Sequence, residues 1–299
     1  MPPKRPERRE AFASLPVVPF RSVADLPRRA LMGIVNVTPD SFSDGGRFAD
    51  ARAAIEHGQD LAVAGAALLD VGGESTRPGA APVDAAEELR RVVPVVRELA
   101  AVAGVPVSVD TTKAAVAAAA LDAGAAMVND VTGGTAEPDL LRVAARADAM
   151  LVVMHMRGTP RTMDAEARYD DVVREVGDEL RARVDAAVDA GVRPDAILAD
   201  PGIGFAKRPA HNLALLAALP ELAERLEVPL LVGASRKSFL GRLLGDAPVD
   251  AREEATLAAT VWSFVRGAAV VRVHDVAASS RAVALLDALE RATQEGMAA

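Results

Sequence analysis

Short apolar runs alternate with longer amphipathic stretches along almost the whole chain. The runs are about three to seven residues long, and most are rich in leucine or β-branched residues, which is typical of strands buried on both faces of a parallel sheet. The eight runs are Leu31–Val37, Ala66–Val71, Val105–Val109, Ala126–Val128, Met150–Met154, Ala196–Ala199, Pro229–Gly233 and Ala268–Val273. This pattern predicts eight strands.

The stretches between the runs carry helical signals. Asp84 followed by Glu87 has the spacing of a capping box and precedes apolar positions that fall on one helix face. A second helix is predicted over Tyr169–Ala190, with Gly191 as the residue that ends it. A third is predicted over Arg252–Gly267. Strands therefore alternate with helices.

Eight such strand–helix units predict a single parallel (β/α)8 barrel, the TIM barrel of the α/β class. The chain has 299 residues, enough for one barrel of about 250 residues. We assign residues 16–299 to the barrel and residues 1–15 to a flexible N-terminal extension. The structural alternative is an open doubly wound sheet, which usually has fewer strands or two half-domains with a linker, and the chain contains no such linker.

Composition narrows the classes of function. The net charge of −8 argues against a nucleic-acid-binding protein, which generally has a basic surface. The absence of cysteine excludes disulfides, thiolate nucleophiles and Cys-ligated metals. No apolar run reaches the roughly 18 residues that span a membrane, and the N-terminus lacks the apolar core of a signal peptide. We therefore expect a cytoplasmic protein with no membrane partner.

Hydrogen-bonding or charged residues stand at the C-terminal end of all eight predicted strands. In a (β/α)8 barrel these ends meet at one mouth, where active sites are built. In chain order the residues are Asn36; Asp70; Asp110; Asn129 and Asp130; Met154 and His155; Asp200; Ser235, Arg236 and Lys237; and Arg272, His274 and Asp275.

A single Asp, Asn or Thr after a strand is often only a cap for the next helix, and we expect that role for Thr111 and Asp275. Asp110, Asn129 and Asp200 follow apolar runs directly, so we expect them low in the mouth and partly buried. A buried carboxylate without a partner is costly, and a ligand donor or a cation is expected beside each.

Two cations stand in the corner of the barrel that usually binds phosphate. Lys237 follows the seventh strand and Arg272 lies within the eighth. Residues 233–238 lead from a strand into a short helix, Phe239–Leu244, whose N-terminus favours an anion. The alternative for this segment is a solvated basic turn, above all for Arg236.

Two Gly-rich loops, residues 38–46 and 72–79, are candidates for lids over a substrate. Ordinary turn chemistry explains their composition equally well.

Eight motifs in order, each at a strand end, resemble those of dihydropteroate synthases. They are residues 36–46 (NVTPDSFSDGG), 70–79 (DVGGESTRPG), 108–111 (SVDT), 129–131 (NDV), 154–157 (MHMR), 200–205 (DPGIGF), 235–237 (SRK) and 272–275 (RVHD). The similarity extends over nearly the whole barrel.

The resemblance implies a set of roles. The residues implied to bind pterin are Asp110, Asn129, Met154, Asp200, Lys237 and Arg272. Those implied to bind p-aminobenzoate are Phe42, Thr76, Arg77, Pro78, Phe205 and Ser238. Those implied to bind diphosphate are Asn36, Arg77, Arg272 and His274, with Asn36 also holding Mg2+. The catalytic set is Asp44, Lys237, Arg272 and His274, with Asp44 closing over the reacting methylene.

The implied reaction condenses 6-hydroxymethyl-7,8-dihydropterin diphosphate with p-aminobenzoate, and the family is commonly dimeric. One rival is a barrel that carries folate for methyl transfer to a corrinoid, which would not need the Ser-Thr-Arg-Pro loop or the Ser-Arg-Lys segment. The other is a non-catalytic paralogue, against which intact Asp44, Arg77 and Lys237 argue.

Overall fold

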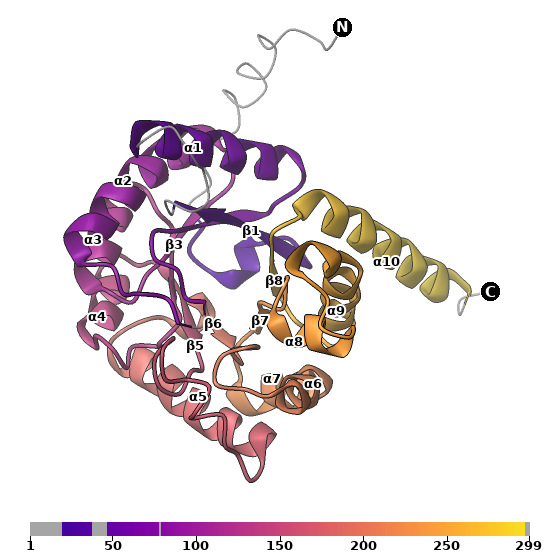
Figure 1. The fold of residues 1–299 in the computed structure, drawn as a ribbon. Helices are drawn as coiled ribbons and strands as arrows, with labels where there is room; N and C mark the ends of the chain where they lie inside the picture. The colour runs from indigo at the N-terminus through magenta and orange to yellow at the C-terminus, as the bar shows by residue number, and fades with distance from the viewer. Residues whose placement is uncertain (1–19, 38–46, 78, 297–299) are drawn as a thin grey trace, which may run out of the picture.

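The computed structural model describes residues 20–37, 47–77 and 79–296, with the backbone alone for residues 47–50. Parallel strands form a central barrel that helices surround (Figure 1). The strands are β1 (Ala30–Asn36), β2 (Leu68–Gly72), β3 (Val107–Asp110), β4 (Met127–Asp130), β5 (Met150–Met154), β6 (Ile197–Asp200), β7 (Leu231–Val232) and β8 (Val270–Val273). The predicted extension at residues 1–15, with its boundary, lies outside the described residues.

The helices follow the strands in turn. They are α1 (Arg47–Val63), α2 (Ala85–Val102), α3 (Ala114–Asp122), α4 (Asp139–Arg146), α5 (Val172–Asp189), α6 (Pro209–Ala217), α7 (Leu219–Leu226), α8 (Ser238–Leu243), α9 (Glu253–Val265) and α10 (Val276–Gly296). Short 3-10 helices cover Val23–Asp25, Pro194–Ala196 and Val249–Ala251.

The strand order confirms the predicted barrel and excludes the open doubly wound sheet. Neighbours follow the chain from β1 to β6, and β8 pairs with both β1 and β7. The ring closes between β6 and β7, where the Ala199 N–H donates to the Pro229 carbonyl at 3.0 Å and Ala199 bridges Leu230. An open doubly wound sheet reverses its strand order in the middle and leaves two edges, whereas this order is circular.

The barrel core explains why the strands appear in the sequence as continuous apolar runs. Every residue of β2, β4, β5 and β6 is buried, including the polar Asp70, Asn129, Asp130 and Asp200. Helices cover the outer face of the sheet and side chains fill its interior, so neither face is left for polar residues except at the mouth.

The helix predictions hold in outline and fail at some ends. Asp84 caps α2 by accepting the Glu87 N–H at 2.7 Å, but the Glu87 carboxylate pairs with arginines of its own helix, so the reciprocal half of the capping box does not form. The predicted start of α5 at Tyr169 is wrong. The helix begins at Val172 because Asp171 caps it, accepting the Arg174 N–H at 3.1 Å.

In the described part of the chain, no helix is both long and apolar enough to cross a lipid bilayer.

Leu151 tests the barrel core. Its side chain is fully buried in β5, so Leu151→Ala should lower the free energy of unfolding by about 2–5 kcal/mol through lost contacts and a cavity. Leu213→Ala, at a side chain 45% exposed on α6, is the matched control and should change it by less than about 0.5 kcal/mol. Urea titrations measure both, and equal effects would contradict the described packing.

Candidate active site

Strand register brings the predicted polar residues together at the carboxyl end of the barrel. Asn36 is paired with Gly72, Gly72 with Asp110, and Asp110 with Asn129, so these positions lie side by side across the first four strands. Further round the barrel, Met154 and Asp200 are paired. The convergence expected from parallel strands is therefore present.

A half-buried arginine holds the deepest acids of the mouth. Arg272 Nε lies 2.6 Å from Asp70 Oδ2, and Arg272 Nη2 lies 3.0 Å from Asp110 Oδ2. The amide nitrogen of Asn129 donates to the same Asp70 oxygen at 2.9 Å. Burial raises the pKa of Asp110 to about 7, while the charge of Arg272 opposes that rise. The cation expected beside Asp110 is therefore Arg272.

Asp70 is a site residue to which the sequence analysis assigned no role. Its side chain is fully buried, and its second carboxylate oxygen, Oδ1, has no hydrogen-bond partner within the part of the chain that the structure describes. The available signal was the one used for Asp110, since Asp70 also follows an apolar run directly. The sequence could not indicate that Arg272 donates its Nε hydrogen bond to Asp70 instead of to a ligand.

Asp200 and Lys237 form the other charged part of the mouth. Asp200 Oδ1 accepts the Gly202 N–H at 2.7 Å. Burial raises the pKa of Asp200 to about 6, against the hydrogen bond from Gly202 and the charge of Lys237. Burial also lowers the pKa of Lys237 to about 8, and its ammonium lies 3.8 Å from the centre of the Phe205 ring. Both groups are charged at neutral pH.

His274 lies in a positive environment. Its Nδ1 is 2.9 Å from Ser235 Oγ, a contact that joins the ends of β7 and β8. Burial, together with the charges of Arg272, Arg236 and Arg77, lowers the pKa of His274 to about 3. The imidazole is therefore neutral at pH 7 while several cations face it, which is the environment that an anionic group would complete.

Apolar side chains form a wall beside these charges. Met154 and Phe205 are 3% and 6% exposed and belong to one cluster with Val131, Met156 and Met163. The structure thus brings together a residue predicted to contact pterin and one predicted to contact p-aminobenzoate.

The remaining predicted residues are more exposed to solvent. Thr76 is half-buried, while Arg77 and Ser238 are exposed. The loop that contains the first two lies beside the loop after β5, because the Gly79 N–H donates to the Pro160 carbonyl at 2.9 Å. Both loops border the mouth.

The observations that bear on a metal concern Asn36. Its half-buried side chain has no hydrogen-bond partner among the described residues. That part of the chain also contains no group of three or more His, Asp or Glu side chains placed to hold a metal ion. Phe42, Asp44 and Pro78, which the sequence analysis places in the site, lie outside the described residues.

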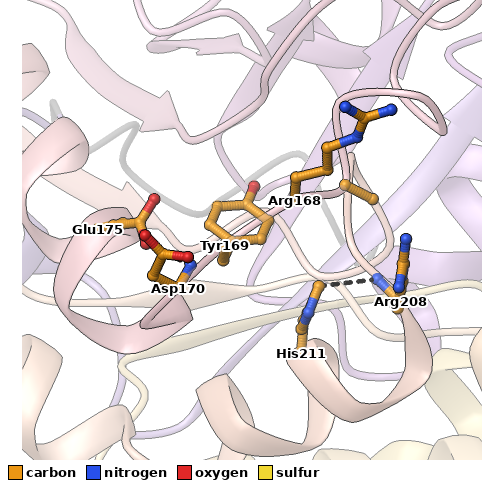
Figure 2. A pocket seen from close by; sticks show the side chains of 7 residues that line it. Arg168, Tyr169, Asp170, Glu175, Arg208 and His211 are labelled. Atoms are coloured by element: carbon orange, nitrogen blue, oxygen red, sulfur yellow. Dashed lines mark hydrogen bonds between the residues drawn. The ribbon is translucent and has the colours of Figure 1, made fainter.

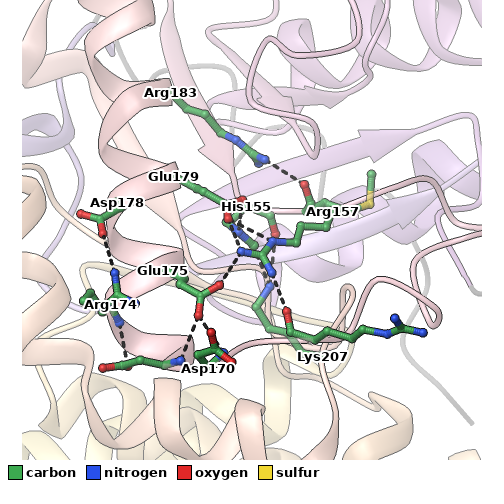
Figure 3. A network of polar contacts seen from close by, with 12 residues as sticks. His155, Arg157, Asp170, Arg174, Glu175, Asp178, Glu179, Arg183 and Lys207 are labelled. Atoms are coloured by element: carbon green, nitrogen blue, oxygen red, sulfur yellow. Dashed lines mark hydrogen bonds and ion pairs between the residues drawn. The ribbon is translucent and has the colours of Figure 1, made fainter.

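A polar network behind the apolar wall was not predicted (Figure 3). Lys207, only 8% exposed, places its Nζ 2.9 Å from His155 Nδ1 and 2.9 Å from the Phe205 carbonyl oxygen. His155 Nε2 lies 3.0 Å from a carboxylate oxygen of Glu179, which also pairs with Arg157. His155 stood at the end of a predicted strand, but nothing in the sequence distinguished Lys207 from a solvated surface lysine.

A cavity of about 430 Å³ lies on the flank of the barrel and not among the predicted residues (Figure 2). Its lining comes from the loop before α5 and the first turns of α5 and α6: Ala167, Arg168, Tyr169, Asp170, Glu175, Arg208 and His211. Tyr169 connects it to the polar network, because the Arg157 guanidinium lies 4.1 Å from the centre of the Tyr169 ring. The charges of the mouth, and not this cavity, mark the candidate active site.

Comparisons with known proteins match most of the chain to one enzyme family. A model of the pterin-binding enzyme family matches residues 32–274. A dihydropteroate synthase of Mycobacterium leprae is 52% identical over 264 residues, which are 86% of this chain and 92% of that protein. A Xanthomonas albilineans dihydropteroate synthase with 4-aminobenzoic acid superposes with a TM-score of 0.83 at 48% identity, covering 88% of this chain and 93% of that one. A structure of the Xanthomonas albilineans enzyme with 7,8-dihydropteroate gives a TM-score of 0.80 at 45% identity, covering 88% and 94%.

Gly202 tests the packing of the turn that orients Asp200. Its φ is +68°, and an added Cβ would lie 1.9 Å from the His155 carbonyl oxygen, so Gly202→Ala should cost about 3 kcal/mol of stability or more. Gly245→Ala is the control, because φ is +72° there and nothing lies within 4 Å, so only the backbone cost of about 1 kcal/mol should appear. Denaturant unfolding compares them, and equal losses would show that the contact with His155 is unimportant.

Proposed function

The chain belongs to the pterin-binding enzymes and, among them, to the dihydropteroate synthases, and on that premise we propose how its barrel mouth carries out the reaction. The enzyme is a transferase of folate biosynthesis that joins 6-hydroxymethyl-7,8-dihydropterin diphosphate to p-aminobenzoate, giving 7,8-dihydropteroate and diphosphate. The observation that carries the proposal is the gathering of Asp110, Asn129, Asp200, Lys237 and Arg272 at one end of the barrel.

The acidic side chains recognise the pterin ring by accepting its hydrogen bonds. A pterin presents its 2-amino group and a ring N–H side by side, and one carboxylate can accept both. Asp200 suits this role because a pKa of about 6 leaves it ionised at neutral pH. Asp110 and Asn129 contact the remaining polar edge, and Lys237 donates to the carbonyl or N5 side. Met154 and the guanidinium plane of Arg272 pack against the ring.

The cations bind the departing diphosphate. Arg272 gives Nε and Nη2 to the protein's own acids, which fixes the plane of the guanidinium and leaves Nη1 for a ligand. His274 is kept neutral by burial and by nearby cations, so a bound anion favours its protonation and adds a donor. Arg77 and Asn36 complete this subsite.

The residues present fit a Mg2+ ion that is held mostly by substrate. Asn36 offers one neutral oxygen at the mouth, and Mg2+ commonly takes one or two protein oxygens together with phosphates and waters. The absence of a three-residue metal cluster in the described part of the chain agrees with such a site. When bound, the ion neutralises charge on the diphosphate.

The reaction begins with departure of the leaving group. The bond between the pterin methylene and the diphosphate oxygen breaks, and its electron pair leaves with diphosphate, whose charge Arg272 and His274 stabilise. The aniline nitrogen of p-aminobenzoate then bonds to the cation-like methylene and releases one proton. Asp44 stands near the methylene in this proposal, and closed loops exclude the water that would compete with the amine. No covalent protein intermediate is needed.

The p-aminobenzoate site lies between the loops after β2, β6 and β7. Phe205, which belongs to the apolar wall, lines this site, and the carboxylate of p-aminobenzoate lies near the start of α8. The residues proposed to line the site are Phe42, Thr76, Arg77, Pro78, Phe205 and Ser238.

Two broader properties are also proposals. We place the enzyme in the cytoplasm and expect a homodimer, which light scattering of the purified chain would test. The direct test of function is an assay with purified protein, Mg2+, pterin diphosphate and p-aminobenzoate, with chromatographic detection of dihydropteroate. Absence of product under conditions in which a related synthase is active would favour a non-catalytic paralogue.

Asp200 provides a pH prediction. Pterin affinity should fall as the pH drops below about 6, because a protonated carboxyl group cannot accept both pterin donors. Asp200→Ala should lower affinity by about 10⁴-fold, since the pterin donors lose their acceptor, and should remove the contribution of Asp200 to this acidic limb. Asp110, whose pKa burial raises to about 7, continues to titrate in the variant. Calorimetry across the pH range measures both, and wild-type affinity in the variant would refute the assignment.

Arg77 separates the two substrates. Arg77→Ala should raise the KM for p-aminobenzoate by about tenfold or more, the effect of losing a hydrogen bond to a charged group. Pterin diphosphate binding should remain nearly unchanged, because the acids that read the ring are untouched. Steady-state kinetics and calorimetry provide the measurements, and loss of pterin binding with normal p-aminobenzoate capture would contradict the placement of this loop.

A further inference from the structure

Lys207 is a buried cation that the proposed reaction does not use. Its Nζ has three acceptors: His155 Nδ1 at 2.9 Å, the Phe205 carbonyl oxygen at 2.9 Å and, more weakly, the His155 carbonyl oxygen at 3.4 Å. None of these belongs to the mouth itself. The amine instead ties the end of β5 to the loop after β6.

Hydrogen-bond accounting assigns one positive charge to the Lys207–His155 pair. The pKa of Glu179 is lowered to about 2 by its hydrogen bonds, so Glu179 is ionised and His155 Nε2 must donate to it. If His155 is neutral, Nδ1 has only a lone pair, and serving all three acceptors, including the His155 carbonyl oxygen at 3.4 Å, takes the three N–H groups of an ammonium, whereas a neutral amine could serve only the two acceptors at 2.9 Å. If the proton sits on Nδ1 instead, Lys207 is neutral and accepts it, and the pair still carries one charge.

Burial disfavours the positive charge of the Lys207–His155 pair, and the charged groups around the pair have both signs. Burial lowers the pKa values of both Lys207 and His155, and the arginines at 157 and 183 act in the same direction on Lys207. The carboxylates of Asp200 and Glu179 oppose them. Glu179 is shared with Arg157, and Asp200 receives the charge of this pair together with those of Lys237 and Arg272.

The same contacts reach Asp200 through the backbone. The missing side chain of Gly202 lets this residue pack directly against the His155 carbonyl group, and Gly202 donates its N–H to Asp200 Oδ1 at 2.7 Å. Lys207 therefore holds the carbonyl against which the Asp200 turn rests. It also holds the carbonyl of Phe205, whose ring lies under the Lys237 ammonium.

We propose that Lys207 is a positioning residue for pterin recognition, clamping the β5 and β6 loops and supplying positive charge behind Asp200. The inference rests on the proposed role of Asp200 as the pterin acceptor. The charged groups around Asp200 are Lys237 from the segment before α8, Arg272 from β8 and Lys207 from the loop after β6. Removing Lys207, which lies behind the mouth while the other two lie in it, weakens the ionised form of Asp200 without removing a group that contacts the pterin.

The experiment compares Lys207→Met and Lys207→Gln with the wild type in binding 6-hydroxymethylpterin, which has no diphosphate and cannot react. Calorimetry from about pH 5 to about pH 8 covers the acidic limb. Lys207→Met should weaken binding at pH 7 by about tenfold or more, comparable to the loss when residues that orient metal ligands are removed. Its acidic limb should move to higher pH, because loss of the positive charge raises the pKa of Asp200.

Lys207→Gln keeps two N–H donors without the charge and serves if Lys207→Met does not fold. Its affinity should fall less at high pH, while its acidic limb should move as in Lys207→Met. Arg181→Met is the matched control, because it removes a cation from α5 whose partners, Asp185, Glu227 and the Leu226 carbonyl oxygen, are not part of the Lys207 network. Arg181→Met should bind the pterin with wild-type affinity, and its acidic limb should lie at the same pH as in the wild type.

The outcomes separate the alternatives. A loss of affinity that is equal at every pH would show that Lys207 is only structural and would overturn the proposed charge. Unchanged affinity and pH limb in both lysine variants would overturn the whole inference. Wild-type protein that binds the pterin but forms no dihydropteroate would refute the proposed function alone, because the binding comparison remains valid without turnover.

Discussion

The mouth of this barrel depends on one half-buried cation, Arg272. Acids at the ends of β2 and β3 lie in a region that excludes water, where an unpaired carboxylate would be strongly destabilising. Arg272 forms ion pairs with both Asp70 and Asp110, and it lies 202 residues from Asp70 in the sequence. β8 contacts β1, and β1 contacts β2, so closure of the barrel itself makes the pairing possible.

The same pairing prepares the site for its substrates. A guanidinium held by two acids has a fixed plane, so a ligand does not have to organise it at the moment of reaction. The network also separates roles within the mouth. Asp200 and Lys237 lie beside the Arg272 cluster, and the Lys237 ammonium contacts the ring of Phe205 in the apolar wall, which suits the recognition of a flat heterocycle with one polar edge.

Phe205 is the point where the inner and outer polar layers meet. Its ring contacts the Lys237 ammonium at the mouth, and its carbonyl group accepts a hydrogen bond from buried Lys207. Behind it, His155 and Glu179 extend the outer layer to α5, and Tyr169 connects that layer to the cavity on the flank. The loops after β5 and β6 are thus fixed from both sides, so Asp200 and Phe205 keep their places without contact from a ligand.

The sequence by itself determined the number and order of strands, the closed architecture and the polar residue at each strand end. It could do so because a strand buried on both faces must be apolar and because parallel strands end at one rim. Asp110, Asn129 and Asp200 could be assigned to the mouth on that basis alone. The partners of these residues were decided only by tertiary structure. The pairing of Asp70 with Arg272 and the contact of Lys207 with His155 join segments far apart in the chain, and the apolar runs that predict each segment carry no information about which distant side chain will satisfy a buried charge. The start of α5 is different, because the Asp171 cap that sets it is a local contact.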